Sequence, residues 1–166
     1  MDLPEGFKEE HNVVFGISHG GLLHLKLNRP KKMNALIPGM YQTLRSQLAS
    51  AKVNDKVKAV LVYGSGGNFS AGNDISNFNQ EPPPQAWVEA MLWENATFDK
   101  PVFYLFQGCC VGVIATMSAF ANFVYCSEDA FFLLPFMSLN ISPEGMCSQT
   151  YPETMGPRKA SEVILS

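Results

Sequence analysis

The glycine-rich segment at residues 64–78 contains the residue types best suited to bind a charged oxygen. It follows an apolar, β-branched run at residues 57–63, which predicts a buried strand. Glycines at positions 64, 66, 67 and 72 permit tight turns and leave backbone N–H groups unshielded by side chains. A strand that runs into such a loop can aim an amide at a ligand oxygen, as in an oxyanion hole.

Other glycine-rich motifs do not fit this segment. The sequence has no Gly-Lys pair, so it lacks the phosphate-binding P-loop pattern. Phe69 stands where a dinucleotide fingerprint needs its last glycine, and Asn68 stands where a hydrolase nucleophile elbow needs its first. For the loop taken alone, a glycine-rich surface turn is the alternative interpretation.

Glu144 is the candidate for a general base. It lies between Pro143 and Gly145, in a stretch from residue 130 to residue 151 that is otherwise uncharged. A carboxylate in apolar surroundings has a raised pKa, which suits proton abstraction near neutral pH. A solvated surface charge is the alternative for any single glutamate in a loop.

Composition limits the classes of partner. The chain has 166 residues, enough for one domain with a sizeable core, and a net charge of −3, which gives no reason to expect nucleic acid or an acidic membrane as partner. No transmembrane helix, signal peptide or transit peptide is indicated. The cysteines show no Cys-x-x-Cys spacing, so we expect reduced, mostly buried thiols and no metal.

The framework that must position these residues is predicted to be α/β. Residues 13–17 and 22–27 predict a hairpin that turns through His19-Gly-Gly21. Asn34 is predicted to cap a helix at residues 35–52 whose apolar stripe contains Leu36, Met40, Leu44, Leu48 and Ala51. The remaining predicted elements are a rigid break at 81–84, helices at 85–99, 112–121 and from Pro157 onward, and strands at 57–63, 102–106, 123–126 and 131–134.

Four segments, in order, resemble the crotonase superfamily, the enoyl-CoA hydratase/isomerase group. Residues 69–75 (Phe-Ser-Ala-Gly-Asn-Asp-Ile) resemble its Phe-x-x-Gly-x-Asp-hydrophobic signature. The other three are residues 27–36, residues 100–112, and residues 136–145, which resemble the catalytic loop of the Δ3,Δ2-enoyl-CoA isomerase branch, especially its peroxisomal-type member. The resemblance implies a single domain over residues 1–166, with the crotonase spiral of ββα units but without the family's C-terminal helices.

The resemblance also implies roles for particular residues. The amides of Ala71 and Val113 would form the oxyanion hole, and Glu144 would be the base. The segment from Ser70 to Asp74 would follow the acyl-CoA, so the implied substrate-binding residues are Ser70, Ala71, Gly72, Asn73, Asp74 and Gly112. Arg29, Lys31 and Lys32 could meet phosphates, with an exposed basic turn as the alternative.

The same comparison favours isomerisation over hydration. Hydratases of the family use two glutamates, and this chain has Thr116 and Phe136 at the corresponding positions. Gln107, Asn122 and Asn140 depart from the family pattern, and Asn140 replaces a glycine at a position where φ is expected to be positive. The rival interpretation is a truncated or degenerate paralogue that binds acyl-CoA or a partner subunit without turnover.

Further expectations follow from the resemblance alone. The substrate would be an acyl-CoA thioester, no separate cofactor would be needed because coenzyme A is part of the substrate, and the full-length form would be a homotrimer. The compartment would be the peroxisome or, alternatively, the mitochondrion.

Overall fold

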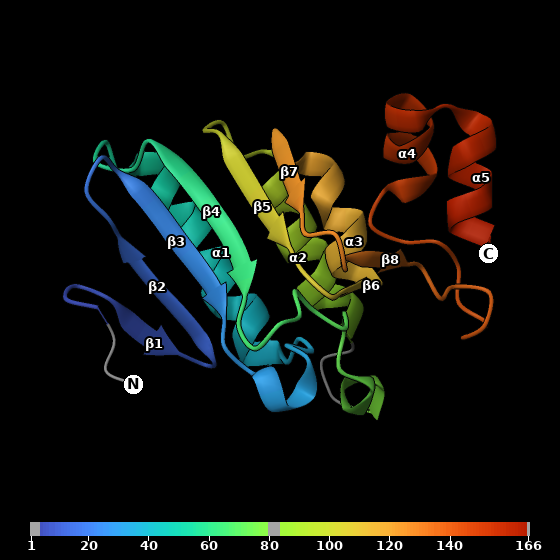
Figure 1. Cartoon of the computed structure of the whole chain (residues 1–166), viewed down its shortest axis with the longest axis horizontal. Helices are drawn as coiled ribbons and strands as arrows, with labels where there is room; N and C mark the ends of the chain where they lie inside the picture. The colour runs from blue at the N-terminus through green and yellow to red at the C-terminus, as the bar shows by residue number, and fades with distance from the viewer. Residues whose placement is uncertain (1–3, 80–83, 166) are drawn as a thin grey trace.

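A six-stranded sheet forms the main layer of the computed structural model, which describes residues 4–79 and 84–165 (Figure 1). Buried residues alternate with partly exposed ones along its central strands, as expected for strands with one face against a core. The order is β1-β2-β3-β4-β5-β7, antiparallel up to β3 and parallel from there. The strands are β1 Lys8–Glu10, β2 Val13–Ile17, β3 Leu22–Leu27, β4 Ala59–Gly64, β5 Val102–Phe106 and β7 Phe123–Cys126.

A second layer of short parallel pairings runs beside the main sheet. β6 (Cys109–Val111) pairs with β8 (Phe131–Leu133), Ser70 pairs with Cys110 of β6, and Asn73 pairs with Leu36. Each of these segments follows a strand of the main sheet, and a helix then leads to the next strand along most of the chain. This repetition of strand, second-layer segment and helix is the predicted crotonase spiral of ββα units.

The first three helices cover one face of the main sheet, and the two C-terminal helices lie to its side (Figure 1). The predicted apolar stripe is confirmed for Met40, Leu44, Leu48 and Ala51, which lie on α1 (Pro38–Val53) and are at most 2% exposed, whereas Leu36 is buried but precedes the helix. The Tyr151 hydroxyl donates to the Ala115 carbonyl at 3.0 Å and so connects the C-terminal helix pair to the short helix that contains Ala115. The helices are α1 Pro38–Val53, α2 Pro84–Ala96, α3 Val113–Met117, α4 Cys147–Met155 and α5 Pro157–Leu165, with 3₁₀ turns at Pro30–Lys32, Ile75–Asn79 and Ser118–Phe120.

Asn34 does not cap a helix, and that prediction is wrong. The first long helix begins at Pro38, after Ile37, while Asn34 itself has a φ of 53°. The Asn34 side chain is fully buried. It accepts a hydrogen bond from the Arg29 backbone N–H and donates to the carbonyls of Ser65 and Asn68. The side chain joins the loop after β3 to the glycine-rich loop after β4.

Other expectations have mixed outcomes. The hairpin through His19-Gly-Gly21 and the helix from Pro157 are confirmed. β1, β6 and α4 were not predicted, and the predicted helix at 112–121 is a short α-helix followed by a 3₁₀ turn. The predicted break at 81–84 lies almost wholly outside the described residues. The cysteines are free and, except Cys126, buried.

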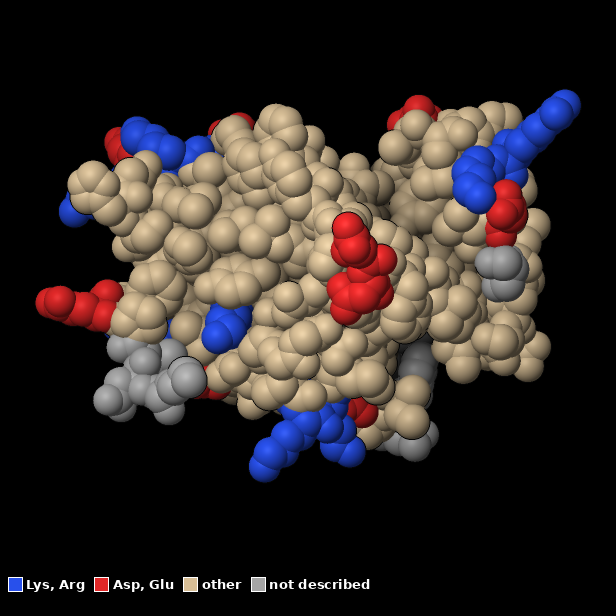
Figure 2. Space-filling view, in the orientation of Figure 1, with Lys and Arg blue, Asp and Glu red and all other residues tan. Residues whose placement is uncertain are grey.

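The strand at the edge of the main sheet, β7, and the second-layer strand β8 both expose apolar side chains. We call these side chains the β7–β8 strip; its members are 41% to 57% exposed and are Phe123, Val124, Tyr125, Phe131, Phe132 and Leu133. Charged side chains are sparse over the face of the sheet that the helices leave open (Figure 2). Apolar patches of this kind usually mark an interface. Within the described ranges, no helix is long and apolar enough to span a bilayer.

Replacing Asn34 with alanine tests its role as a connector between loops. The Asn34→Ala variant would leave one backbone N–H and two carbonyls without their partners, so we expect the free energy of unfolding to fall by about 3 kcal/mol. Asn54→Ala is the control, because the Asn54 side chain, in an exposed turn, bonds only the Lys56 backbone N–H within the part of the chain that the structure describes. Urea denaturation of both variants measures the difference, and equal losses would contradict the assigned role.

Candidate active site

One cavity of about 600 Å³ brings together residues from separated parts of the chain. Its lining contains Ala71, Asn73, Gly112, Val113 and Glu144. The other lining residues are mostly apolar: Ile75, Val88, Val111, Pro135, Phe136, Leu139, Ile141, Ser142 and Pro143. A cavity with a few polar groups in apolar walls is the usual form of a small-molecule site.

Two glycines allow the backbone segments at this cavity to approach closely. Gly72 has a φ of 83° and Gly112 has a φ of 64°. A Cβ on Gly72 would lie 2.5 Å from the Val111 carbonyl oxygen and 3.6 Å from the Gly112 Cα. Because a side chain at Gly72 would collide with this backbone, only glycine permits the contact.

The residue after each of these glycines carries a backbone N–H without an acceptor among the described residues. Leu36 donates to the Gly72 carbonyl at 2.7 Å and accepts from the Asp74 N–H at 2.9 Å. In this parallel pairing the Asn73 N–H and carbonyl point away from Leu36. Val113 is the first residue of α3, so its N–H has no partner within the helix.

The Ala71 amide is not available as an oxyanion donor, which contradicts its predicted role. Its N–H donates to the Met33 carbonyl at 2.8 Å. Gly72, which separates Ala71 from Asn73, has a φ of 83°, so the alternation of N–H directions along an extended strand does not relate the two amides. Asn73 was predicted only as a substrate-binding residue; the pairing with Leu36 that frees its N–H leaves no signal in the sequence.

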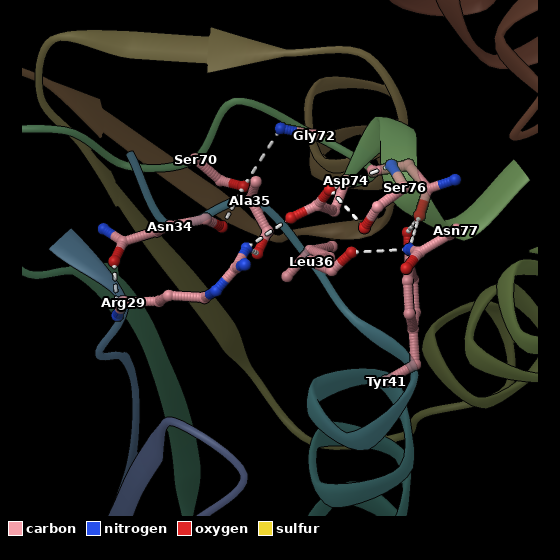
Figure 3. A network of polar contacts seen from close by, with 11 residues as sticks. Arg29, Asn34, Ala35, Leu36, Tyr41, Ser70, Gly72, Asp74, Ser76 and Asn77 are labelled. Atoms are coloured by element: carbon pink, nitrogen blue, oxygen red, sulfur yellow. Dashed lines mark hydrogen bonds and ion pairs between the residues drawn. The ribbon is translucent and has the colours of Figure 1, made fainter. Parts of the chain in front are cut away.

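Ser70, Gly72 and Asp74 were predicted to bind substrate, but none of them is in the lining of the cavity. The Ser70 hydroxyl is fully buried, donates to the Asn34 carbonyl at 2.8 Å and accepts from the Gly72 N–H at 3.1 Å. Figure 3 shows these contacts together with the Asp74 cluster. These groups fix the shape of the loop.

Asp74 forms an ion pair with Arg29 at 2.6 Å, so the Arg29 guanidinium is already engaged in a contact within the fold (Figure 3). Arg29 also donates to the Ala35 carbonyl at 3.0 Å. Hydrogen bonds from the Ser76 hydroxyl and backbone N–H, together with Arg29, lower the pKa of Asp74 to about 2. The prediction that Arg29 meets phosphates is not supported, whereas Lys31 and Lys32 are exposed and that part stays a prediction.

Glu144 lies half-buried in the wall of the cavity. Burial raises the pKa of its carboxyl group, as expected where the charged form loses water. In the part of the chain that the structure describes, the carboxylate takes part in no ion pair that would oppose this shift. The site therefore holds a carboxylate whose proton affinity is increased.

The two positions that correspond to hydratase glutamates carry no acid or base. The Thr116 side chain is fully buried and donates to the Val113 carbonyl at 2.8 Å. Phe136 is 1% exposed and forms part of the apolar wall. Asn140, in the same segment as Glu144, has a φ of 53°, which confirms the expected positive value.

Residues 4–79 and 84–165 contain no set of side chains that could bind a metal ion. No group of three or more His, Cys, Asp or Glu side chains there could hold an ion. Among the described residues, the cavity is lined by one carboxylate, that of Glu144, and by the two residues whose amides have no acceptor, Asn73 and Val113.

Comparison with known proteins gives a consistent family. Residues 18–166 match the enoyl-CoA hydratase/isomerase family. The chain is 36% identical over 159 residues to human enoyl-CoA delta isomerase 2, an alignment that covers 89% of the chain and 40% of that protein. For mouse "enoyl-CoA delta isomerase 3, peroxisomal", identity is 32% over 164 residues, with 94% and 51% covered.

A solved structure agrees with these relatives. The enoyl-CoA hydratase/isomerase from Pseudoalteromonas atlantica T6c matches with a TM-score of 0.87 and 29% identity, covering 93% of this chain and 61% of that one. The chain thus spans 40% to 61% of the lengths of these three proteins.

The acid sensitivity of the fold tests the role of Asp74. Its low pKa means that the ionised form stabilises the fold above pH 3.8 and that this contribution is lost as the pH falls toward 2. We expect Asp74→Asn to lower the free energy of unfolding by about 2 kcal/mol at neutral pH and to flatten its decline in acid. Thermal unfolding between pH 2 and 7 measures both effects.

Asp55→Asn is the matched control, because Asp55 is exposed in the turn after α1. Its stability curve should follow that of the unmodified chain. An Asp74→Asn curve that also follows it would contradict the assigned ion pair.

Proposed function

The chain belongs to the enoyl-CoA hydratase/isomerase family, and on that premise we propose that it converts 3-enoyl-CoA to trans-2-enoyl-CoA. One observation carries this proposal: a single half-buried carboxylate, Glu144, lines the same cavity as the unpaired amides of Asn73 and Val113. Shifting a double bond needs a proton removed and returned, together with stabilisation of the charge that develops between the two steps.

In the proposed reaction the thioester oxygen accepts hydrogen bonds from the Asn73 and Val113 amides. The Glu144 carboxylate takes a proton from C2, and the electron pair of that C–H bond forms a dienolate held by the two amides. The protonated Glu144 then returns the proton at C4, which places the double bond between C2 and C3. Glu144 ends unprotonated, and no water or cofactor is consumed because coenzyme A is part of the substrate.

Two features support isomerisation over hydration. Hydration would require a second acid or base to activate water, and among the described residues Glu144 is the one titratable residue in the lining of the cavity. The named relatives include delta isomerases from human and mouse. The rival activity, binding of acyl-CoA without turnover, has no structural feature of its own in its favour.

The proposal extends to assembly and compartment. The homotrimer implied by the family resemblance stays a proposal, and the β7–β8 strip is the surface we propose for its interface, because its six apolar side chains are about half exposed. The peroxisome is the proposed compartment, with the mitochondrion as alternative, since a peroxisomal mouse isomerase and a mitochondrial rat dienoyl-CoA isomerase are among the relatives.

Glu144→Gln tests the proposed base. Glutamine keeps the shape of the side chain but cannot accept the proton, so we expect turnover of 3-hexenoyl-CoA to fall by about 10²–10⁴-fold. Formation of 2-hexenoyl-CoA measures the rate, and binding of a saturated acyl-CoA should be retained. Loss of binding together with turnover would mean that Glu144 supports the cavity and does not act as the base.

The dependence of kcat/KM on pH gives a second readout for the same residue. Because burial raises its pKa, the activity should rise with pH through a midpoint above the usual pKa of a glutamate, about 4.3.

If 3-hexenoyl-CoA binds to the unmodified chain but does not react, the isomerase proposal fails and binding without turnover takes its place.

A charge in the β7–β8 strip tests the proposed assembly. Val124 is 41% exposed at the edge of the sheet, and Val124→Asp would place a carboxylate in an apolar interface, so we expect trimers to dissociate to monomers. Val53→Asp is the control, because Val53 is 85% exposed at the end of α1, outside the strip. Sedimentation equilibrium measures the mass, and a monomeric unmodified chain would refute the trimer.

A further inference from the structure

We propose that Asn77 and Tyr41 are positioning residues, which fix the direction in which the Asn73 amide donates to the substrate. The inference rests on the proposed function and assigns it two residues outside the lining of the cavity. Asn77 lies in the 3₁₀ turn after the glycine-rich loop, and Tyr41 lies in the first turn of α1. Both side chains reach Asn73, at 0% and 2% exposure respectively.

Asn77 is hydrogen-bonded to the side chain of Asn73 and to Leu36, the residue that pairs with Asn73. Its Nδ2 donates to the Asn73 side-chain oxygen at 2.5 Å and to the Leu36 carbonyl at 2.8 Å (Figure 3). The same Leu36 carbonyl accepts from the Asp74 N–H, and the Leu36 N–H donates to the Gly72 carbonyl. Leu36 is therefore hydrogen-bonded to the residues on both sides of Asn73. Asn77 therefore ties the side chain of Asn73 to the residue that orients its backbone.

The hydrogen bonds of Asn77 indicate that its side chain contributes through the two N–H donors of Nδ2. Its Oδ1 is buried and, within the residues that the structure describes, has no hydrogen-bond partner. An unpaired buried oxygen costs free energy, so an apolar side chain of similar size would serve mere packing better. What asparagine adds here is one N–H for Asn73 and one for Leu36.

Tyr41 connects the same point to the long helix. Its hydroxyl donates to the Asn73 side-chain oxygen at 3.5 Å. Burial, with a smaller contribution from the Glu144 charge, raises the pKa of Tyr41, so the phenol stays protonated and can act as donor. The Asn73 oxygen thus receives two donors, from α1 and from the 3₁₀ turn, which leaves its carboxamide one orientation.

The chain offers a matched pair of residues elsewhere in the core. The Tyr104 hydroxyl donates to the Asn95 side-chain oxygen at 3.4 Å, and the Asn95 Nδ2 donates to the Met91 carbonyl at 2.8 Å. Tyr104 is 1% exposed and Asn95 is 6% exposed. Neither lines the cavity, so the pair repeats the chemistry and burial without the proximity to the amides.

The first experiment compares Tyr41→Phe with Tyr104→Phe, and Asn77→Ala with Asn95→Ala. A misdirected oxyanion donor weakens the transition state more than the ground state, so we expect kcat to fall by about 10-fold in Tyr41→Phe and Asn77→Ala, with KM changed by less than about 2-fold. The Tyr104 and Asn95 variants should keep kcat, whatever their melting temperatures. Equal kcat values in a variant and its matched control overturn the inference.

A spectroscopic readout separates this inference from the proposed function. A bound 2,4-hexadienoyl-CoA absorbs at longer wavelength when donors polarise its thioester carbonyl. We expect the shift to be present with the unmodified chain, reduced in Tyr41→Phe and unchanged in Tyr104→Phe. Tyr41→Phe keeps the ring and its packing, so this comparison holds even if Asn77→Ala does not fold.

The combined outcomes are distinct. If the unmodified chain produces the shift without turnover, and Tyr41→Phe loses it, the proposed isomerase fails and the positioning role stands. If the chain turns over substrate and every variant retains both the shift and kcat, the positioning role is overturned and the isomerase stands. If the unmodified chain shows neither shift nor turnover, both are overturned.

Discussion

The contact between Gly72 and the backbone at Val111 and Gly112 is the constraint on which the site depends. β4 and β5 are parallel neighbours, so the segments that follow them leave the same edge of the sheet. Without a Cβ on Gly72 these segments can touch, and a Cβ would lie 2.5 Å from the Val111 oxygen. The residues that follow the two glycines, Asn73 and Val113, then present their amides to one cavity.

Holding a buried loop in this shape requires partners for its backbone groups. Irregular segments lack the hydrogen bonds of a helix or sheet, and buried backbone groups without partners are costly. Here side chains supply them: Asn34 serves Arg29, Ser65 and Asn68, and Ser70 serves Asn34 and Gly72. The Arg29–Asp74 ion pair closes the same cluster (Figure 3). The polar residues of the signature segment thus do structural work beside the cavity.

The sequence predicted much of the framework, because hydrophobic periodicity reflects burial directly. The hairpin, the stripe on α1 and the strands of the main sheet carry that signal, and the Glu144 segment carries a recognisable motif. The direction in which a backbone N–H points leaves no such signal in the sequence. Ala71 was therefore predicted as the oxyanion donor, whereas Asn73 has the amide without an acceptor among the described residues. The prediction that Asn34 caps a helix was wrong for a related reason. In sequence, an asparagine that caps a helix cannot be told from one whose side chain connects two loops. α4 escaped prediction because it contains Pro152 and many polar residues.

The position of Glu144 depends on packing at Thr116. Gly145, next to Glu144, has a φ of 68°, and a Cβ on it would lie 2.2 Å from the Thr116 hydroxyl. The segment that carries Glu144 therefore rests directly on Thr116. A glutamate at position 116 would need the space in which this segment lies, because its side chain extends beyond the γ carbon by a carboxyl group. In this chain, Thr116 leaves α3 without a carboxylate at this position, and the same residue is in contact with the segment that carries Glu144.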